Sequence, residues 1–113
     1  MQRKVNKYLW DMLDAAEAIV AFTDGLSIEE YKGSDLLSSA VERKFEIIGE
    51  ALKRVLELDP GIEAQIGDCR AIIDFRNRLI HGYDSIDYDA VWTIVKDQLP
   101  NLIRDLQKSL NSV

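Results

Sequence analysis

The 113-residue chain contains one cysteine, one histidine and two prolines, and its shortages exclude whole classes of protein. The lone cysteine, Cys69, cannot form an internal disulfide, which excludes a disulfide-stabilised fold. No apolar run approaches the roughly 20 residues that a membrane-spanning helix requires. No charged segment followed by an apolar stretch opens the chain, as it would in a secretory signal. We therefore expect a cytoplasmic protein that is not inserted in a membrane.

The chain also lacks a basic surplus, because its 14 lysines and arginines face 20 acidic residues and the formal net charge is -6. Domains that hold nucleic acid by bulk electrostatics usually carry a basic surplus, so any contact with nucleic acid must be local. Hydrophobic residues make up 47% of the chain, enough for a core at this length. We expect residues 1–113 to form a single domain.

Strand-like alternation is missing too, whereas apolar residues recur at steps of three and four over long stretches. This pattern predicts helices from Lys4 to about Phe22, along Leu37 to Val55, between Asp68 and Gly82, and from Asp87 through Leu110. Ser27 and Glu30 form a capping-box pattern that starts a further helical segment, which residues 33–35 either end or only bend. The sequence therefore predicts an all-α fold, an antiparallel four-helix bundle with a short extra helix.

Four residues within these helices carry more specific expectations. Asp68 and Asp87 can each cap the helix that follows. Gly49 costs its helix about 1 kcal/mol relative to alanine, which is tolerable if another helix packs closely there. Pro100 should kink the last helix or remove one of its hydrogen bonds.

The stretch from Asp74 to Tyr83 holds the single histidine and places a charge where helical periodicity calls for an apolar side chain. On a helical wheel at about 100° per residue, Arg76 falls within the apolar arc formed by Ile72, Ile73, Phe75, Leu79 and Ile80. A buried guanidinium costs several kcal/mol unless it is paired. Arg76 must therefore contact a carboxylate, a partner subunit or an anionic ligand, and an internal salt bridge is the simplest of these.

The other side of the same helix carries a polar row at spacings of four, three and four, formed by Arg70, Asp74, Asn77 and His81. Taken alone, His81 is most simply a surface histidine. With an arginine nearby, a catalytic role for His81 becomes more plausible. An imidazole moves protons near neutral pH, and a guanidinium binds the charge that accumulates on phosphorus. Together the two suit phosphodiester cleavage without a metal or another cofactor.

Other chemistries fit the chain less well. A tight metal site needs several ligands, and the single histidine and single cysteine have no clustered partners. Glu42, Glu46 and Glu50 share one helix face and could imitate a carboxylate site, but a solvated face or pairing with Arg76 or another arginine is the better interpretation. No nucleophile elbow or phosphate-binding loop is present.

The segment Arg76-Asn77-Arg78-Leu79-Ile80-His81-Gly82-Tyr83 resembles the R-x-x-x-x-H-x-Y signature of HEPN-domain proteins, in particular the HepT-like ribonuclease toxins. The polar Asn77 directly after the arginine is typical of that pattern. Residues 40–51 resemble the second helix of the same subfamily. The resemblance implies a HEPN-like helical bundle that forms a homodimer, with catalytic Arg76 and His81 and a supporting Asn77. Arg76 and His81 are roughly 140° apart on an ideal helix, so a second copy would help them converge.

The resemblance further implies an endoribonuclease toxin of a type VII-like toxin-antitoxin pair, in which the ribose 2′-hydroxyl attacks the adjacent phosphorus and leaves a cyclic phosphate. Its partner would be a minimal nucleotidyltransferase antitoxin (MntA-like) that transfers AMP to the motif tyrosine, here Tyr83. Arg70, Arg78 and Arg43 could supply the local positive charge for an RNA substrate.

Two other functions stay open at this point. The chain could be a non-catalytic helical subunit that binds substrate or nucleotide for a separate nucleotidyltransferase, or a plain dimerisation module. RNA cleavage that depends on His81 distinguishes the first reading from both.

Overall fold

The computed structural model describes residues 3–111, apart from the side chain of Tyr83, and its regular elements in that range are all helical. The α-helices are α1 (Arg3–Thr23), α2 (Ile28–Lys32), α3 (Asp35–Leu58), α4 (Cys69–His81), α5 (Tyr88–Thr93) and α6 (Leu99–Asn111). Two 3₁₀ turns, η1 (Pro60–Ala64) and η2 (Tyr83–Ser85), and one π-helical turn, η3 (Ile94–Gln98), complete the list. The all-α prediction is confirmed for this part of the chain.

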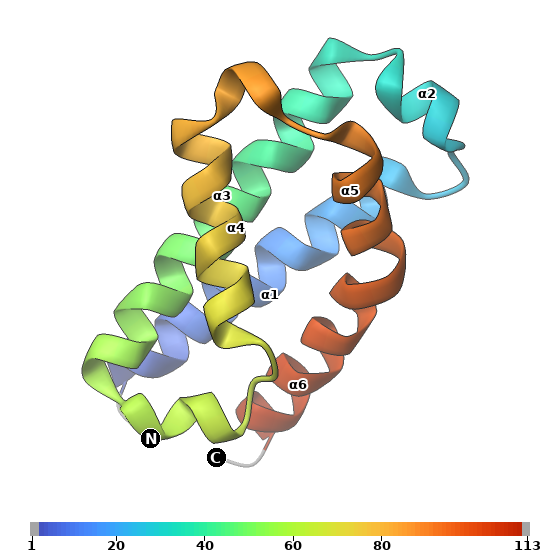
Figure 1. Ribbon diagram of the computed structural model, residues 1–113. Helices are drawn as coiled ribbons and strands as arrows, with labels where there is room; N and C mark the ends of the chain where they lie inside the picture. Colours follow the sequence, from blue (N-terminus) through green and yellow to red (C-terminus); the bar gives the residue numbers. More distant parts are fainter. Residues whose placement is uncertain (1–2, 112–113) are drawn as a thin grey trace.

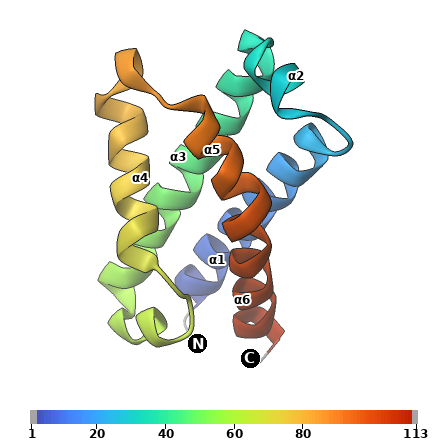
Figure 2. The same cartoon turned by 45° about the vertical axis from the view of Figure 1, so that its right-hand side comes forward.

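The long segments α1, α3, α4 and the continuous α5–η3–α6 rod run alternately up and down the molecule (Figure 1). Helix α1 packs against α3 and α6, while α4 packs mainly on α3. Helix α4 therefore forms one side of the molecule, as the turned view shows (Figure 2). Within residues 3–111 no helix is both long and apolar enough to cross a membrane.

The apolar stripes that the sequence predicts form the core. Helix α4 contributes Cys69 and Leu79, which are almost fully buried. The fully buried members come from α1, α3 and the α5–η3–α6 rod and include Leu9, Met12, Ile19, Val41, Ile48, Leu52, Val55, Leu99 and Leu106. The prediction is wrong for Ile80, which was placed in the apolar arc but is 37% exposed, and Val20, at the apolar spacing of the first helix, is 42% exposed. Ile80 lies toward the edge of the apolar arc of α4, where a small rotation of the helix decides burial, whereas Val20 lies near the end of α1.

Side-chain caps fix most of the helix starts. Ser27 Oγ accepts a hydrogen bond from the Glu30 amide at 3.1 Å, and Glu30 Oε1 accepts one from the Ser27 amide at 3.0 Å, which confirms the capping box. Ser34 caps α3, so residues 33–35 end α2 rather than bend it. Asp87 caps α5 as predicted, through the Ala90 amide.

The predicted cap at Asp68 is wrong. Asp68 does precede α4, but its backbone is left-handed, with φ at 59°, and its side chain makes no capping hydrogen bond. The turn is held from another element instead, because the Gly67 amide donates to Asp105 Oδ2 of α6 at 3.1 Å. Sequence reasoning could not find this contact, since its acceptor lies 38 residues away.

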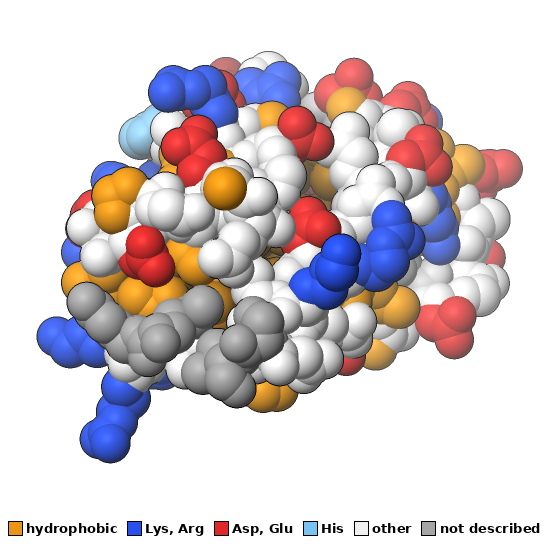
Figure 3. Space-filling view, turned by 90° about the horizontal axis from the view of Figure 1, so that it is seen from below, with side chains coloured by type: hydrophobic (Ala, Val, Ile, Leu, Met, Phe, Trp, Pro, Cys, Tyr) orange, Lys and Arg blue, Asp and Glu red, His pale blue; other side chains and the backbone are white. Residues whose placement is uncertain are grey.

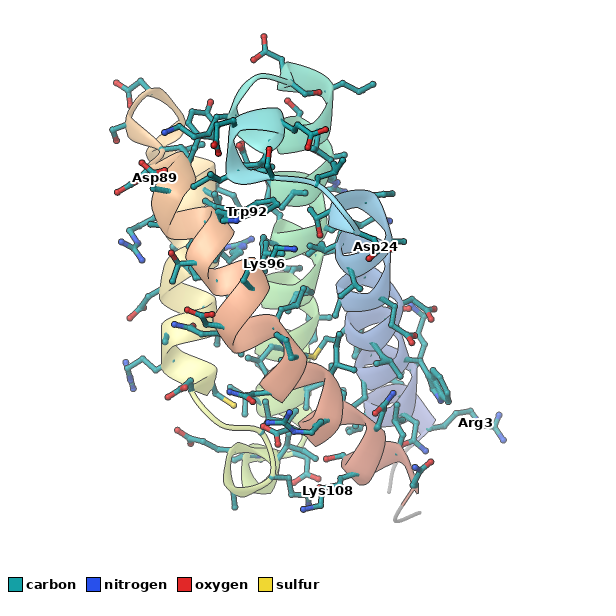
Figure 4. The ribbon with its side chains drawn as sticks, turned by 90° about the vertical axis from the view of Figure 1, so that its right-hand side faces the viewer. Arg3, Asp24, Asp89, Trp92, Lys96 and Lys108 are labelled. Carbon is teal, nitrogen blue, oxygen red and sulfur yellow. The ribbon has the colours of Figure 1, made fainter. Side chains whose placement is uncertain are left out.

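Helices α2 and α5 meet through aromatic side chains. The rings of Tyr31 and Trp92 lie 5.3 Å apart between centroids, and Tyr31 is fully buried. Lys96, one turn after Trp92, places its ammonium group 4.6 Å from the centre of the Trp92 ring (Figure 4). The contact between Tyr31 and Trp92 joins the short extra helix to the last long segment.

Pro100 distorts the last helix as predicted. The turn before it, η3, is π-helical, and the Leu99 amide donates to the Ile94 carbonyl five residues back. Proline lacks an amide hydrogen and crowds the carbonyl four residues before it. The wider turn accommodates both effects without ending the segment.

Candidate functional site

Arg76 lies on the face of α4 that packs against α3, and its side chain is 20% exposed. Gly49 of α3 makes this approach possible. A Cβ atom at position 49 would lie 2.6 Å from Arg76 Cγ and closer still to Arg76 Cβ. The predicted close helix packing at Gly49 is therefore confirmed, and the group that it admits is the stem of Arg76.

Two neighbours hold the Arg76 guanidinium. Nη2 donates to Glu50 Oε2 at 2.8 Å, and Nη1 donates to Asn77 Oδ1 at 2.9 Å. The third nitrogen, Nε, is buried and has no hydrogen-bond partner among the described residues. Of the three possibilities for Arg76, the structure shows the internal salt bridge with a carboxylate.

The row of glutamates on α3 is divided among different partners. Glu50 pairs with Arg76 and also lies 3.4 Å from Arg54 Nε, while Glu46 lies 3.5 Å from Arg43. Glu42 is half-buried, and burial raises its pKa, with a smaller contribution from the charge of Glu46. Pairing with arginines, one of the two interpretations left open by the sequence, accounts for two of the three carboxylates.

These groups line an open groove between α1, α3 and α4. The residues that line it are Tyr8, Asp11, Arg43, Glu46, Ile47, Glu50, Ala51, Arg54, Arg76 and Ile80. Three arginines and three carboxylates thus line one hollow. The groove is therefore a charged surface on which positive groups are locally concentrated within an acidic chain.

His81 is the last residue of α4 and its side chain is exposed. It does not line the groove that holds Arg76. The structure therefore brings Asn77 and Arg76 together within one chain but leaves His81 outside the groove. The 140° separation expected on an ideal helix fits this arrangement.

The other predicted basic residues fall into two groups. Arg43 lines the same groove as Arg76, whereas Arg70 and Arg78 are exposed on α4 outside it. Arg78 places its guanidinium carbon 5.9 Å from the centre of the Phe75 ring. Basic and acidic side chains are interspersed over the face seen in Figure 3, rather than sorted into separate surfaces.

Sequence reasoning missed Arg54, the third arginine of the groove. The signal was available, because Arg54 follows Glu50 by four residues, a spacing that favours an ion pair on a helix. Tyr83, the predicted modification site, begins η2 two residues after His81, and its side chain lies outside the described part of the structure.

A larger and more apolar cavity of about 440 Å³ lies between α3, α4, η3 and α6. Its lining includes Phe45, Ile72, Phe75 and Leu102, but neither Arg76 nor His81. Across residues 3–111 no three His, Cys, Asp or Glu side chains are grouped so as to hold a metal ion. The arginine groove is therefore the better candidate for phosphate chemistry.

Comparison with known proteins gives a family match over most of the chain. The family model described as Ribonuclease HepT-like matches residues 12–109. "Probable ribonuclease HepT" of Thermococcus cleftensis is 32% identical over 108 residues, covering 96% of this chain and 97% of the relative. "Putative RNase MJ1380" of Methanocaldococcus jannaschii is 32% identical over 106 residues, covering 94% of this chain and 96% of the relative. No solved structure matches the chain.

Proposed function

The chain belongs to the HepT-like ribonuclease family, and we propose that it is an endoribonuclease that cleaves RNA with Arg76 and His81 and needs no metal. The observation that carries the proposal is the Arg76 guanidinium, held by Glu50 and Asn77 at the wall of an open groove. A fixed guanidinium suits the charge of a phosphorus centre that gains a fifth oxygen.

In the proposed reaction the ribose 2′-oxygen attacks the adjacent phosphorus and the 5′-oxygen leaves. A neutral His81 imidazole takes the 2′-hydroxyl proton, and an imidazolium returns a proton to the leaving oxygen. The products are a 2′,3′-cyclic phosphate and a 5′-hydroxyl end. Arg76 stabilises the additional negative charge at phosphorus, and Asn77 keeps its guanidinium in place. DNA lacks the attacking hydroxyl and should not be cut.

We propose that the working site forms in a homodimer. Within one chain His81 is exposed outside the groove that contains Arg76. A two-fold interface presents the same surface of both copies, so α4 of one copy can bring its His81 toward the Arg76 groove of the other. Arg43 and Arg54 in the groove, and Arg70 and Arg78 outside it, would then contact RNA phosphates.

A toxin of this kind needs a means of silencing, and we propose a minimal nucleotidyltransferase antitoxin of the MntA type as the partner. The Tyr83 hydroxyl would attack the α-phosphorus of ATP bound to the partner and release pyrophosphate, which leaves AMP on the tyrosine. Tyr83 is two residues from His81, so the added phosphate would repel RNA from the site.

The first test is cleavage of a labelled single-stranded RNA by the purified wild-type chain and by a His81→Ala variant, with a chelator present. The products' ends are then identified. Cleavage by the wild type alone, with cyclic phosphate ends, supports the proposal. Equal cleavage by His81→Ala refutes the role of His81. Absence of cleavage by a wild type that is folded and unmodified at Tyr83 refutes the ribonuclease and favours a non-catalytic subunit.

A further inference from the structure

Glu50 belongs to α3, yet it is bonded to the arginine of the proposed site on α4. We infer that Glu50 is a positioning residue, which fixes the Arg76 guanidinium in the orientation that binds the phosphate undergoing cleavage. The inference rests on the proposed ribonuclease function. The inference adds a residue of α3 to a proposed site that the sequence motif places on α4 and the residues just after it.

The hydrogen bonds of Arg76 fix both ends of its guanidinium plane. Nη2 donates to Glu50 at 2.8 Å and Nη1 donates to Asn77 at 2.9 Å. A single bond would leave the plane free to turn, whereas two bonds to different terminal nitrogens define its orientation. Asn77 is the neighbour of Arg76 on the same helix, so Glu50 alone ties the guanidinium to α3.

The stem of Arg76 is confined by the same turn of α3. Its Cβ and Cγ atoms lie against Gly49, the residue directly before Glu50. Stem and head are therefore both determined by two adjacent α3 residues, one without a side chain and one with a carboxylate. Such a guanidinium is ordered before substrate binds, which is the condition under which electrostatic stabilisation costs no reorganisation.

The pairing leaves Arg76 able to bind a phosphate. A guanidinium has five N–H groups, two on each terminal nitrogen, so one N–H remains on Nη1 and one on Nη2 after the two observed bonds. Glu50 is also 3.4 Å from Arg54, so two guanidinium groups share one carboxylate. Phosphate can therefore bind to the free N–H groups of Arg76 without displacing Glu50.

A purely structural salt bridge predicts a different result from a positioning residue. Glu50 is 41% exposed, so its pairing is partly screened by water and its loss need not unfold the chain. A structural role would then lower thermal stability and leave turnover of the folded protein unchanged. A positioning role lowers kcat, because a displacement of about 1 Å in a catalytic group can cost on the order of 100-fold in rate.

The test compares the wild type with Glu50→Ala and Glu50→Gln in cleavage of one labelled single-stranded RNA, with kcat and KM determined separately. Glu57→Gln is the matched control, since Glu57 is on the same helix and pairs with Arg54 but does not line the groove. We expect kcat to fall by on the order of 100-fold in Glu50→Ala. The loss should be smaller in Glu50→Gln, whose amide oxygen can still accept from Nη2, and Glu57→Gln should match the wild type.

A second readout does not depend on cleavage. Slow rotation of a held guanidinium gives separate NMR signals for its two terminal nitrogens, which are assigned to Arg76 by their absence in Arg76→Lys. We expect separate signals in the wild type and in Glu57→Gln, and merged signals in Glu50→Ala. Circular dichroism confirms that each variant is folded.

Three results would overturn the inference: an unchanged kcat in folded Glu50→Ala, a loss confined to KM, or an equal loss in Glu57→Gln. A wild type that cuts no RNA would overturn the proposed function instead. In that case the NMR signals alone decide whether Glu50 orients Arg76.

Discussion

Gly49 of α3 lies directly against the stem of Arg76 on α4, so the distance between these two helices is set at the residue that the proposed chemistry needs most. Any side chain at position 49 would push against Arg76 Cβ and Cγ. Helix packing and guanidinium placement are thus determined by the same contact.

Replacing Gly49 by alanine should destabilise the fold and reduce cleavage. Overpacking of a core typically costs about 1–3 kcal/mol, whereas alanine gains about 1 kcal/mol over glycine in a helix. We expect a net loss of up to about 2 kcal/mol in the free energy of unfolding, measured by urea denaturation. Ser39→Gly and Ser39→Ala, at an exposed position of α3, measure the helix-propensity contribution alone. The difference between Ser39→Ala and Ser39→Gly gives the stability that alanine gains over glycine in α3. If Gly49→Ala gains the same free energy of unfolding over the wild type, the close contact at Gly49 is contradicted.

Replacing Arg76 by lysine should abolish most cleavage although the charge is retained. Lysine is a point charge on a flexible stem. It cannot reproduce the planar guanidinium that donates hydrogen bonds to Glu50 and to Asn77 at the same time. The measurement is kcat on labelled RNA, with Arg104→Lys on α6 as the control for a general effect of the exchange. Wild-type turnover in Arg76→Lys would remove the proposed role of the guanidinium at phosphorus.

Replacing Tyr83 by phenylalanine should prevent modification by the proposed partner. The purified chain is incubated with that nucleotidyltransferase and ATP, and its intact mass is measured. Wild type and Tyr88→Phe should gain the mass of AMP, because Tyr88 is a neighbouring exposed tyrosine outside the motif. A mass gain on Tyr83→Phe would place the acceptor elsewhere.

The thiol of Cys69 predicts a loss of stability at alkaline pH. Burial, followed by the charges of Glu63, Asp68 and Asp105, raises its pKa from 9.0 to about 11. The thiol is neutral in both states below pH 9, and above that pH the unfolded chain ionises first. Unfolding therefore becomes easier between about pH 9 and 11, by roughly 2–3 kcal/mol in total, since one pKa unit corresponds to about 1.4 kcal/mol.

Urea unfolding of the wild type and of Cys69→Ala at several pH values checks this prediction. Other groups titrate in the same range, so the difference between the two proteins is the informative quantity. The gap should shrink as the pH rises from 9 to 11. A constant gap would show that the buried thiol does not drive the pH dependence.

Local features were predictable from the sequence because their causes lie within a few residues. The capping box at Ser27 and Glu30, the cap at Asp87 and the distortion at Pro100 all depend on neighbours along one helix. The predicted cap at Asp68 is wrong because the backbone there is left-handed, in a turn that a hydrogen bond from Gly67 ties to the distant Asp105. A pattern of spacings does not record such contacts.

The candidate site shows the same limit. The wheel required a partner for Arg76, but three glutamates on α3 were eligible, and only the relative position of the two helices selects Glu50. Arg76, Asn77, His81, Tyr83 and the basic residues around them remain predictions as functional groups. The separation of His81 from the groove was predictable, because it follows from the spacing of residues on one helix. The functional role of His81 was not, because in the proposed dimer that role depends on a second copy of the chain.

The π-helical turn at residues 94–98 has a consequence for the phase of the last segment. The buried residues Val91, Val95 and Leu99 follow one another at steps of four, and in a regular α-helix each such step drifts by about 40° at 100° per residue. A π turn has more residues per turn, so it cancels this drift and returns Leu99 to the inner face. One rod can therefore pack against α2 at its beginning and against α1 at its end. Because the wide turn holds one residue more than an α-helical turn, deleting one residue from it should restore a regular α-helix and leave the leucines of α6 facing the core.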